Sequence, residues 1–543
     1  MSNNFLFSNT NQNMSVAAAD LRNRLTAYSD QPTVITLEPG TYTFDKPGTL
    51  HKELTASGTV DAPKDIVFDF SDMQNLVFDG QGSSLVFRDR LTPFVLQGAR
   101  NVTLKNFDID FTFSRYCQGT VTESDEQGFT LYIDSSTFGY DVDEKGHINF
   151  HCGSASFSTE STTVLLANEI FGCAPWDYIF AGDYLYSKEN LATGHLETDA
   201  VRIDEDHVRF IYRDTSRRPV YEVGSTFLFC YEPRENVNIF LDSCENIQLE
   251  NINIYRGGGM GIVAHTCRDI TCDGVKITMK PGRNECRSTT ADGMYFVQCS
   301  GKVTVRNCEI SATLDDALNI HGIYTKVVSQ ESPNVLIASI CFDAHKDITP
   351  FTAGAEVAFS NHITQCEESR ATVVFAEKLD GMTTRLTLDR PVSPAIGDFI
   401  ECVGLSAEFL FENNYVSRCP HLRISGPAAK VIRGNKFEEI YAVLVSDLMA
   451  YWFESGCVHD MLIEGNSFKN CPRCGDSFPI VINNTRGADV NIRHENIRIV
   501  DNVFDSALGN AVSVELVRGL TIKNNRGVSP NGLQITNCEN VEL

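Results

Sequence analysis

The sequence predicts an all-β protein: a right-handed parallel β-helix with two inserted small β-barrel-like domains and a short N-terminal capping helix. Three observations predict it. A short phrase of alternating apolar and polar residues recurs at a nearly constant spacing, Asn or Gly stands at its turns, and two long stretches lack it. Alternation with period two is typical of strands, and recurrence at a fixed interval is typical of stacked repeats.

The N-terminal element is a helix. Residues 15–28, SVAAADLRNRLTAY, place Ala and Leu at helical spacing, and an open stack of coils needs a cap at its end. The stretch ITLEPGTYTF that follows is expected to begin the first coil.

The recurring phrase defines the coils. Its copies start at Asn101, Asn246, Asp269, Lys302, Glu408, Lys430, Asp460, Asn496 and Gly519. Neighbouring copies such as those at 246 and 269 are 23 residues apart. Asn and Gly tolerate positive φ, so they supply the turns between strands. A leucine-rich repeat has a similar length, but its Leu and Asn ladder is absent from these copies.

Two stretches without the phrase contain other strand-like runs, such as HVRFIYR in the first and ATVVFAE in the second. Strands at this spacing indicate small barrels inserted at coil edges. The predicted domains are the cap and first coils (1–116), a first inserted barrel (117–230), the catalytic coils (231–325), a second inserted barrel (326–405) and the C-terminal coils (406–543).

Composition limits the function. The chain has 543 residues, 42% of them hydrophobic, and a formal net charge of −26. A nucleic-acid partner would need a basic surface, and no apolar run is long enough to span a membrane. Anionic polymers such as pectate are disfavoured, so a neutral carbohydrate is the expected partner. The oligomeric state is not encoded in these patterns; we allow for a homodimer.

The 18 cysteines lie largely within the apolar alternation, which favours buried reduced thiols over a disulfide framework. The single CxxC at Cys471 has no second pair at zinc-site spacing, so we expect no metal and no cofactor. The first residues lack the basic start and apolar core of a secretory signal. The expected location is therefore cytoplasmic, or periplasmic or secreted if the N-terminus was trimmed.

Three carboxylates carry the candidate chemistry. Asp292 and Asp315 are 23 residues apart, one coil, so they are expected to stack on one face about 4.8 Å apart. Asp316 would point the other way unless the pair lies at a strand–turn junction. Carboxylates this close repel unless one keeps its proton, and glycoside hydrolysis needs one protonated and one ionised carboxyl group. The structural alternative is that these residues only cap turns.

Other polar residues are candidate substrate ligands. Asn319 and His321 follow the aspartates and could bind sugar hydroxyls or satisfy a turn. Trp452 and Glu454 place an aromatic ring beside a carboxylate, a candidate sugar platform, although a lone Trp is more often a core residue. Arg287, on the loop before Asp292, is either a substrate ligand or a surface charge.

Several long blocks occur in a specific order: YEPREN at Tyr231, GGMGIVAHTC at Gly258, STTADGMYF at Ser288, LDDALNIHGIYTKVV at Leu314 and YWFESGCVHDMLIEGN at Tyr451. In these blocks the chain resembles glycoside hydrolase family 110, bacterial exo-acting α-1,3-galactosidases that remove blood-group-B-type galactose. His265 lies in the second block and joins the candidate substrate ligands.

The resemblance implies a β-helix with inserted barrels that acts with inversion and uses no metal. It also implies that Asp292, Asp315 and Asp316 are the catalytic carboxylates. We assign Asp315 as the general acid and Asp292 or Asp316 as the group that activates water. Coil spacing alone, about 5 Å, would suggest retention, because inversion expects roughly 6.5–9.5 Å between the two groups.

The chain departs from the family pattern after Asp292. The family carries Ala-Thr-His-Phe there, whereas this chain has Gly293-Met294-Tyr295-Phe296. The loss of a histidine beside a catalytic residue puts the accepted sugar or linkage in doubt.

Two rival functions remain. A pectinase-type β-helix hydrolase also has an Asp and an Asp-Asp pair on neighbouring coils. Its Gly-His-Gly and Arg-x-Lys elements are absent at the matching places, and the net charge disfavours polyuronate. The other rival is a non-catalytic glycan-binding β-helix, because a fold alone does not fix a function.

Overall fold

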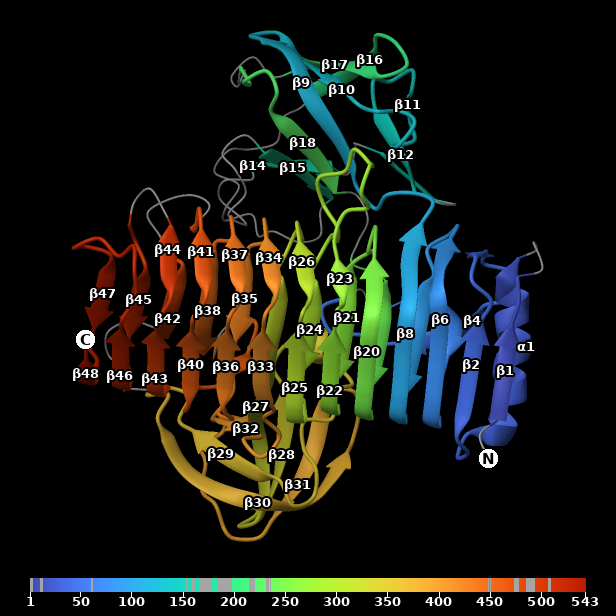
Figure 1. Cartoon of the computed structure of the whole chain (residues 1–543). Coiled ribbons are helices and arrows are strands. Elements are labelled where there is room, and N and C mark those ends of the chain that lie inside the picture. The colour runs from blue at the N-terminus through green and yellow to red at the C-terminus, as the bar shows by residue number, and fades with distance from the viewer. Residues whose placement is uncertain are drawn as a thin grey trace.

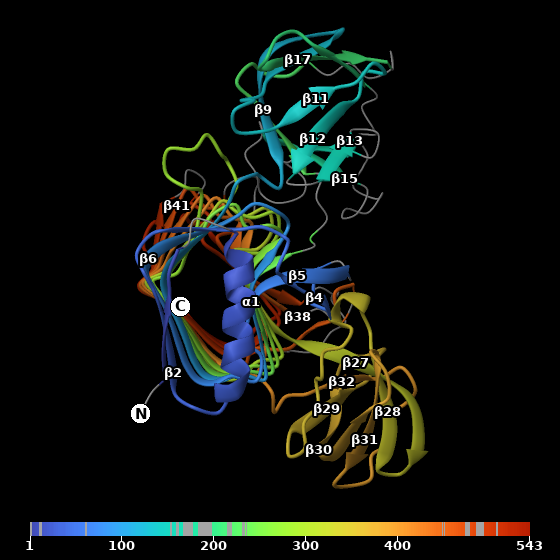
Figure 2. The same ribbon diagram turned by 90° about the vertical axis from the view of Figure 1, so that its right-hand side faces the viewer.

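The computed structural model describes residues 3–9, 13–59, 62–152, 155–158, 162–166, 177–182, 198–213, 220–230, 234, 236–447, 449, 451–472, 478–484, 494–505 and 509–543, with side chains left out for 152–182, 230 and 484. Parallel strands stack into a long column with three sides, seen from the side in Figure 1 and along its axis in Figure 2. This arrangement confirms the predicted parallel β-helix.

The strands of each side pair in parallel with the coil before and the coil after. The first side contains β1 (Asn3–Phe7), β2 (Thr33–Leu37), β6 (Gln74–Phe87), β8 (Arg100–Phe111), β20 (Glu245–Ile254), β22 (Arg268–Asp273), β25 (Ser300–Arg306), β33 (Glu408–Glu412), β36 (Lys430–Arg433), β40 (Met461–Glu464), β43 (His494–Val500), β46 (Val517–Lys523) and β48 (Glu539–Glu542). The second side contains β3 (Thr41–Phe44), the later halves of β6, β8 and β20, then β23 (Lys276–Ile277), β26 (Glu309–Ser311), β34 (Tyr415–Ser417), β37 (Lys436–Glu438), β41 (Ser467–Lys469) and β44 (Val503–Asp505).

The third side carries the candidate site. It contains β5 (Ala62–Asp69), β7 (Thr92–Gln97), β19 (Val237–Asp242), β21 (Met260–His265), β24 (Met294–Val297), the start of β27 (Leu318–Ser332), β35 (His421–Ile424), β38 (Ala442–Asp447), β42 (Ile480–Asn484), β45 (Val512–Glu515) and β47 (Leu533–Thr536). Two short strands pair antiparallel to it, β4 (Leu50–Leu54) with β5 and β39 (Glu454–Ser455) with β27.

One continuous apolar core fills the column. Inward residues of each strand alternate with outward ones, as for Leu318 and Ile320 on β27, which lie in the core while Asn319 and His321 face out. Phenylalanines stack along the axis towards the C-terminus, where the rings of Phe437, Phe468 and Phe504 are 4.9 and 5.0 Å apart. The described cysteines of the core are free thiols, as predicted.

The corners of the coils use the residues that the repeat predicted. Asn101, Asn246, Asp269 and Asn496, each the first residue of a phrase copy, have φ between 54° and 58°. A short polar side chain tolerates this left-handed conformation. The corners also bond to each other along the axis, since the Asn246 amide donates to the Asn101 side-chain oxygen at 2.9 Å.

A buried asparagine ladder links the C-terminal coils. From one coil to the next, the backbone N–H of each member donates to the side-chain oxygen of the following one. The members are Asn414, Asn435, Asn466, Asn502 and Asn525. These bonds satisfy polar groups that would otherwise be stranded between coils.

The helix α1 (Met14–Leu25) and the 3₁₀ turn η1 (Thr26–Tyr28) cover the N-terminal end of the column, as predicted (Figure 2). The side chain of Asn13 caps the helix by accepting from the Ser15 N–H at 2.9 Å. Met14, Ala18, Leu21 and Leu25 turn towards the core. The structure adds a strand before the helix, β1, which pairs with β2 and starts the column one strand earlier than predicted.

The first insertion lies above the column and the second below it in the view of Figure 1, and the two project from different sides of the column in Figure 2. The first has β9 (Cys117–Asp125), β10 (Gly128–Tyr132), β11 (Tyr140–Val142), β12 (Ile148–Cys152), β13 (Ala155–Ser158), β14 (Thr162–Leu166), β15 (Asp177–Gly182), β16 (Thr198–Arg202), β17 (His207–Tyr212) and β18 (Thr226–Cys230). Seven of these strands form one sheet, in the order β14-β15-β18-β9-β10-β17-β16.

The second insertion is a closed antiparallel barrel. The end of β27 pairs with β28 (Val335–Ile340), and the ring continues through β31 (Thr383–Leu388), β30 (Glu367–Lys378), β29 (Glu356–Ser360) and β32 (Phe399–Glu401) back to β27. Because β27 belongs to both the column and the barrel, the barrel continues directly from the third side. No helix in the described part of the chain has the length and apolarity needed to cross a bilayer.

Candidate active site

Two stacked turns on the third side present the aspartates. Asp292 lies just before β24, and Asp315 and Asp316 lie just before β27. In each turn a threonine hydroxyl donates to the carbonyl oxygen two residues later at 2.6 Å, Thr289 to Ala291 and Thr313 to Asp315. Thr289 and Thr313 also pair as a parallel bridge. The strand–turn junction lets neighbouring carboxylates reach one site.

The register corrects one expectation. Met294 pairs with Leu318 and Thr289 with Thr313, an offset of 24 residues, so Asp292 is in register with Asp316 and not with Asp315. The offset of 23 residues is correct for the phrase copies at 246 and 269, since Ile247 pairs with Ile270. The coil between β24 and β27 holds one more residue, and a repeat count cannot reveal a local insertion of one.

Asp292 is the buried acid of the group. It is 4% exposed. Burial raises the pKa of Asp292 well above its usual value, and the nearby charges of Asp315 and Asp316 raise it further. A carboxyl group in this setting keeps its proton near neutral pH. Gly293 allows the coils to approach here, because a Cβ at this position would lie 2.5 Å from the Ala317 carbonyl oxygen.

Asp316 is held as a carboxylate. The His421 Nδ1 donates to one oxygen at 2.9 Å, and the Arg423 Nε donates to the other at 3.1 Å. Burial alone would raise the pKa of Asp316, but the Arg423 charge and the His421 hydrogen bond outweigh it and lower the pKa below its usual value. Two stacked carboxyl groups thus have pKa values displaced in opposite directions.

Asp315 is the most exposed of the three, with 21% of its side chain accessible. It forms an ion pair with Arg234 through one oxygen, and the other accepts the Asp316 N–H at 3.0 Å. Arg234 belongs to the YEPREN block, whose Tyr231–Pro233 and Glu235 lie outside the described residues.

Polar atoms without partners lie beside the aspartates. Asn319 donates to Glu454 Oε1 at 3.2 Å, and His321 Nε2 lies 3.7 Å from the same oxygen. Asn319 Oδ1, Glu454 Oε2 and His321 Nε2 are buried and have no hydrogen-bond partner. Leaving such groups unpaired is costly, so they indicate a place for a polar ligand. Glu454 arrives on β39, which folds back antiparallel onto β27.

Three buried histidines lie near one another, His265 and His321 on the third side and His345 in the second insertion. The ring of His321 is 5.1 Å from Tyr295 and 5.7 Å from His345, which belongs to the short turn η4 (Asp343–His345). His265 lies on β21, where its Nε2 accepts the Ser57 N–H at 3.0 Å. Burial lowers the pKa of His265 to about 4 and lowers that of His321 and His345. His265 therefore anchors the β4–β5 hairpin as a neutral side chain.

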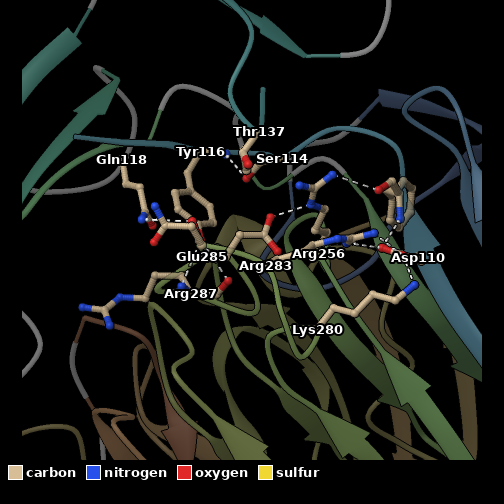
Figure 3. A network of polar contacts seen from close by, with 12 residues as sticks. Asp110, Ser114, Tyr116, Gln118, Thr137, Arg256, Lys280, Arg283, Glu285 and Arg287 are labelled. Atoms are coloured by element: carbon tan, nitrogen blue, oxygen red, sulfur yellow. Dashed lines mark hydrogen bonds and ion pairs between the residues drawn. The ribbon is translucent and has the colours of Figure 1, made fainter. Parts of the chain in front are cut away.

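Arg287 lies in a polar network that fixes the loop between β23 and β24 (Figure 3). The Tyr116 hydroxyl accepts the Arg287 N–H at 3.0 Å and donates to its carbonyl oxygen at 3.1 Å. Asp110 accepts from Lys280 and Arg283, and Arg256 forms a buried ion pair with Glu285. The network holds the residues that lead into Asp292.

Trp452 lies at the outer end of the same region. Its side chain packs edge-on against Phe342, with 5.3 Å between ring centroids, and the residue is 47% exposed. The structure thus groups Asp292, Asp315 and Asp316, joins Asn319, His321 and Glu454 in one cluster, and places Trp452 on the exposed rim. Within the described residues, no group of three or more His, Cys, Asp or Glu is arranged to hold a metal ion.

The sequence analysis missed His421 and Arg423. Once the second insertion is removed, LNIHG at Leu318 and LRISG at Leu422 are copies of one strand on consecutive coils, and β27 pairs with β35 in that register. Recognising this repeat in the sequence would have placed Arg423 and His421 beside the aspartates. Tyr295 and His345 gave no such signal, because one is a single residue in an apolar strand and the other lies within the insertion.

Three curated proteins that are similar in sequence to this chain are all named α-1,3-galactosidase. It is 25% identical over 508 residues to α-1,3-galactosidase B of Bacteroides thetaiotaomicron, covering 90% of this chain and 79% of that protein. It is 25% identical over 490 residues to α-1,3-galactosidase A of Shewanella woodyi, covering 87% and 76%. A third relative, from Parabacteroides distasonis, is 27% identical over 461 residues, covering 81% and 72%.

No family model matches the chain. Among solved structures, a polygalacturonase from Erwinia carotovora aligns over 99% of this chain and 96% of that one, at 10% identity and a TM-score of 0.44. The sequence relatives cover most of the chain. They confirm the resemblance read from its motifs: over most of its length the chain is similar to bacterial proteins named α-1,3-galactosidase.

Proposed function

We propose that this protein is a glycoside hydrolase that releases terminal α-linked galactose, with α-1,3 linkages as the main target, by an inverting acid/base mechanism. One observation carries the proposal. Asp292 and Asp316 occupy equivalent positions on stacked coils, yet their pKa values are shifted in opposite directions. Glycoside hydrolysis needs such a pair, one protonated carboxyl group and one carboxylate. The choice of galactose as the released sugar rests on the names of the relatives.

The proposed division of roles differs from the one expected from the sequence, in which Asp315 was the general acid. Asp292, not Asp315, is the buried carboxyl group that keeps its proton, so Asp292 protonates the glycosidic oxygen as the bond to the anomeric carbon breaks. Asp316, paired with Arg423, and Asp315, paired with Arg234, orient the attacking water, and the Asp316 carboxylate takes its proton. In this mechanism the water adds to the opposite face of the sugar, which inverts the anomeric carbon.

The polar atoms without partners beside the aspartates bind the terminal galactose. Asn319 Oδ1 and Glu454 Oε2 accept hydrogen bonds from sugar hydroxyls, and His321 Nε2 provides a third polar contact. A terminal sugar that satisfies these buried atoms is distinguished from an analogue lacking a hydroxyl, because the analogue leaves them unpaired.

A substrate whose leaving group needs no protonation distinguishes the general acid from the residues that activate water. The fluoride of α-galactosyl fluoride leaves without protonation, whereas the sugar leaving group of galactosyl-α-1,3-galactose requires it. Asp292→Asn should lower kcat/KM for the disaccharide about 100-fold or more and affect the fluoride far less. Asp315→Asn and Asp316→Asn should impair both substrates, because both need activated water.

The control is Asp269→Asn, an exposed corner residue of the column, which should match the wild type on both substrates. If Asp292→Asn lost both activities equally, Asp292 would not be the acid. If all three site variants kept full activity on both, the carboxylates would not be catalytic and the glycan-binding alternative would stand.

The released anomer tests inversion and specificity together. Proton NMR during hydrolysis should show β-galactose before mutarotation, and other terminal α- or β-linked sugars should be cleaved far more slowly. Release of α-galactose first would contradict the inverting mechanism. Cleavage of polygalacturonate without cleavage of galactosides would instead favour the pectinase-type alternative.

A further inference from the structure

We propose that Trp452, supported by Phe342 of the second insertion, is the platform that binds the leaving-group sugar, on the far side of the bond that is cleaved. The inference rests on the proposed function and adds a specificity-determining surface to it. The two residues are 110 positions apart in sequence, and the fold brings their rings into contact, with centroids 5.3 Å apart.

A chain of rings runs from Tyr295, at the buried end of the site that we call the floor, to Trp452, at the exposed end that we call the rim. Tyr295 lies against His321, His321 against His345, His345 against Phe342, and Phe342 against Trp452. The successive centroids are 5.1, 5.7, 5.5 and 5.3 Å apart. The inner members are buried, whereas Trp452 is 47% exposed. Exposure thus increases along one continuous path away from the catalytic carboxylates.

The floor and the rim have different chemistry. The floor holds the unpartnered polar atoms of Asn319, His321 and Glu454, which suit the hydroxyls of an enclosed terminal sugar. The rim presents the half-exposed indole of Trp452, and an aromatic ring suits the apolar C–H face of a second sugar ring. Since the floor takes the terminal sugar, a ring at the exposed end can contact only the part of the glycan beyond the scissile bond.

The short segment from Trp452 to Glu454 connects the rim to the floor. Trp452 is two residues before Glu454, whose strand β39 pairs with β27 at Gly322 and Ile323. The Lys326 ammonium lies 4.8 Å from the centre of the Phe453 ring between them, which holds this part of the loop against the barrel. A leaving-group sugar on Trp452 would therefore be bound at a fixed position relative to Glu454, and binding energy from that remote contact can lower the barrier to cleavage.

The experiment compares two substrates that share the terminal galactose but differ in the leaving group. Trp452→Ala should lower kcat/KM for galactosyl-α-1,3-galactose by about tenfold, equal to about 1.4 kcal/mol. The same variant should stay within about twofold of the wild type on α-galactosyl fluoride, whose leaving group has no ring to stack. Trp452→Phe should recover most of the loss, because it keeps an aromatic face.

The matched control is Phe375→Ala, which removes a 58% exposed aromatic ring from β30 on the outer part of the same barrel (Figure 1). It should change neither substrate. Equal losses on both substrates for Trp452→Ala would show that the ring only supports Glu454, and no loss on either would show that it does not touch the glycan. Both results overturn the platform. If the wild type cleaved neither substrate, the proposed function itself would fail.

Discussion

At the scale of single residues, the site works through the environments of chemically identical side chains. Asp292 and Asp316 are both buried aspartates on equivalent turns. The difference is that Arg423 and His421 reach Asp316, whereas Asp292 faces the negative charges of its neighbours. In the proposed mechanism, one residue type thereby supplies both the acid and the base.

The pH dependence of the rate should report these two groups. Activity should fall at high pH as Asp292 loses its proton, and at low pH as Asp316 gains one below its lowered pKa. Arg423→Met removes the charge that lowers the Asp316 pKa, so the acid limb of kcat/KM should move up by about one pH unit or more. Arg433→Met, a surface change, should leave the profile in place. An unmoved acid limb in Arg423→Met would assign it to another group.

Lys430 is a second residue governed by its surroundings. It lies inside the column, where its register neighbours Phe409 and Met461 are core residues, and its Nζ donates to the Ala407 carbonyl oxygen at 2.8 Å. Burial lowers the pKa of Lys430 to about 7. The unfolded chain keeps this proton up to the ordinary value of 10.5, so between those values the unfolded state binds more protons and rising pH favours the folded state.

Lys430→Met should therefore raise the free energy of unfolding at pH 7 or below, by on the order of 1 kcal/mol or more, and flatten its rise towards alkaline pH. Urea unfolding at several pH values measures both effects. The control is Lys436→Met, an exposed lysine on the same coil, which should change neither. A parallel pH dependence in wild type and Lys430→Met would refute the assignment to Lys430.

At the scale of elements, the repeating parts of the molecule were predictable and the irregular parts were not. The phrase copies predicted most strands of the first side and many of their corners, because many corner residues are Asn, Asp or Gly with positive φ. The register at Asp292 was not predictable, because one extra residue in a turn leaves no trace in the alternation. Glu454 reaches the site on an antiparallel strand, which a count of coils does not describe.

The loop between β23 and β24 depends on a buried ion pair. The Arg256 and Glu285 side chains are 7% and 1% exposed. Arg256→Met would leave the Glu285 charge buried without its partner, so it should destabilise the protein by about 3–5 kcal/mol. Because this loop leads into Asp292, kcat should fall as well, even at temperatures where the protein stays folded. Urea unfolding and kcat/KM measure the two effects.

The comparison for that change is Arg433→Met, which removes an ion pair with Glu412 on the surface, where the arginine side chain is 48% exposed. Its cost should be no more than about 1 kcal/mol. Similar small losses in both variants would mean that the loop holds without the Arg256 pair.

At the scale of the whole molecule, neutral histidines lie where hairpin β4–β5, the third side and the second insertion meet. The pKa values of His265, His321 and His345 are all lowered by burial. The unfolded chain takes up these protons near the ordinary value of 6.5, and folded His265 does so only near 4. In this window the unfolded state binds more protons, so stability falls as pH falls.

The melting temperature should therefore decrease between pH 6.5 and 4, and His265→Gln should show a weaker decrease than the wild type. His51→Gln, which changes a largely exposed histidine on the same hairpin, serves as the control. The same slope in wild type and His265→Gln would contradict a role for His265 in acid sensitivity.

The antiparallel return of β39 has a consequence for partial molecules. Asp292, Asp316, Arg423 and Glu454 come from four successive turns of the solenoid, the last from the loop that follows β38. Coils in such an array can fray from an end while the rest remains folded. A nicked or truncated chain that keeps both aspartates but loses β39 would be structured and yet inert. In the proposed mechanism, turnover therefore requires a chain that is folded at least through β39.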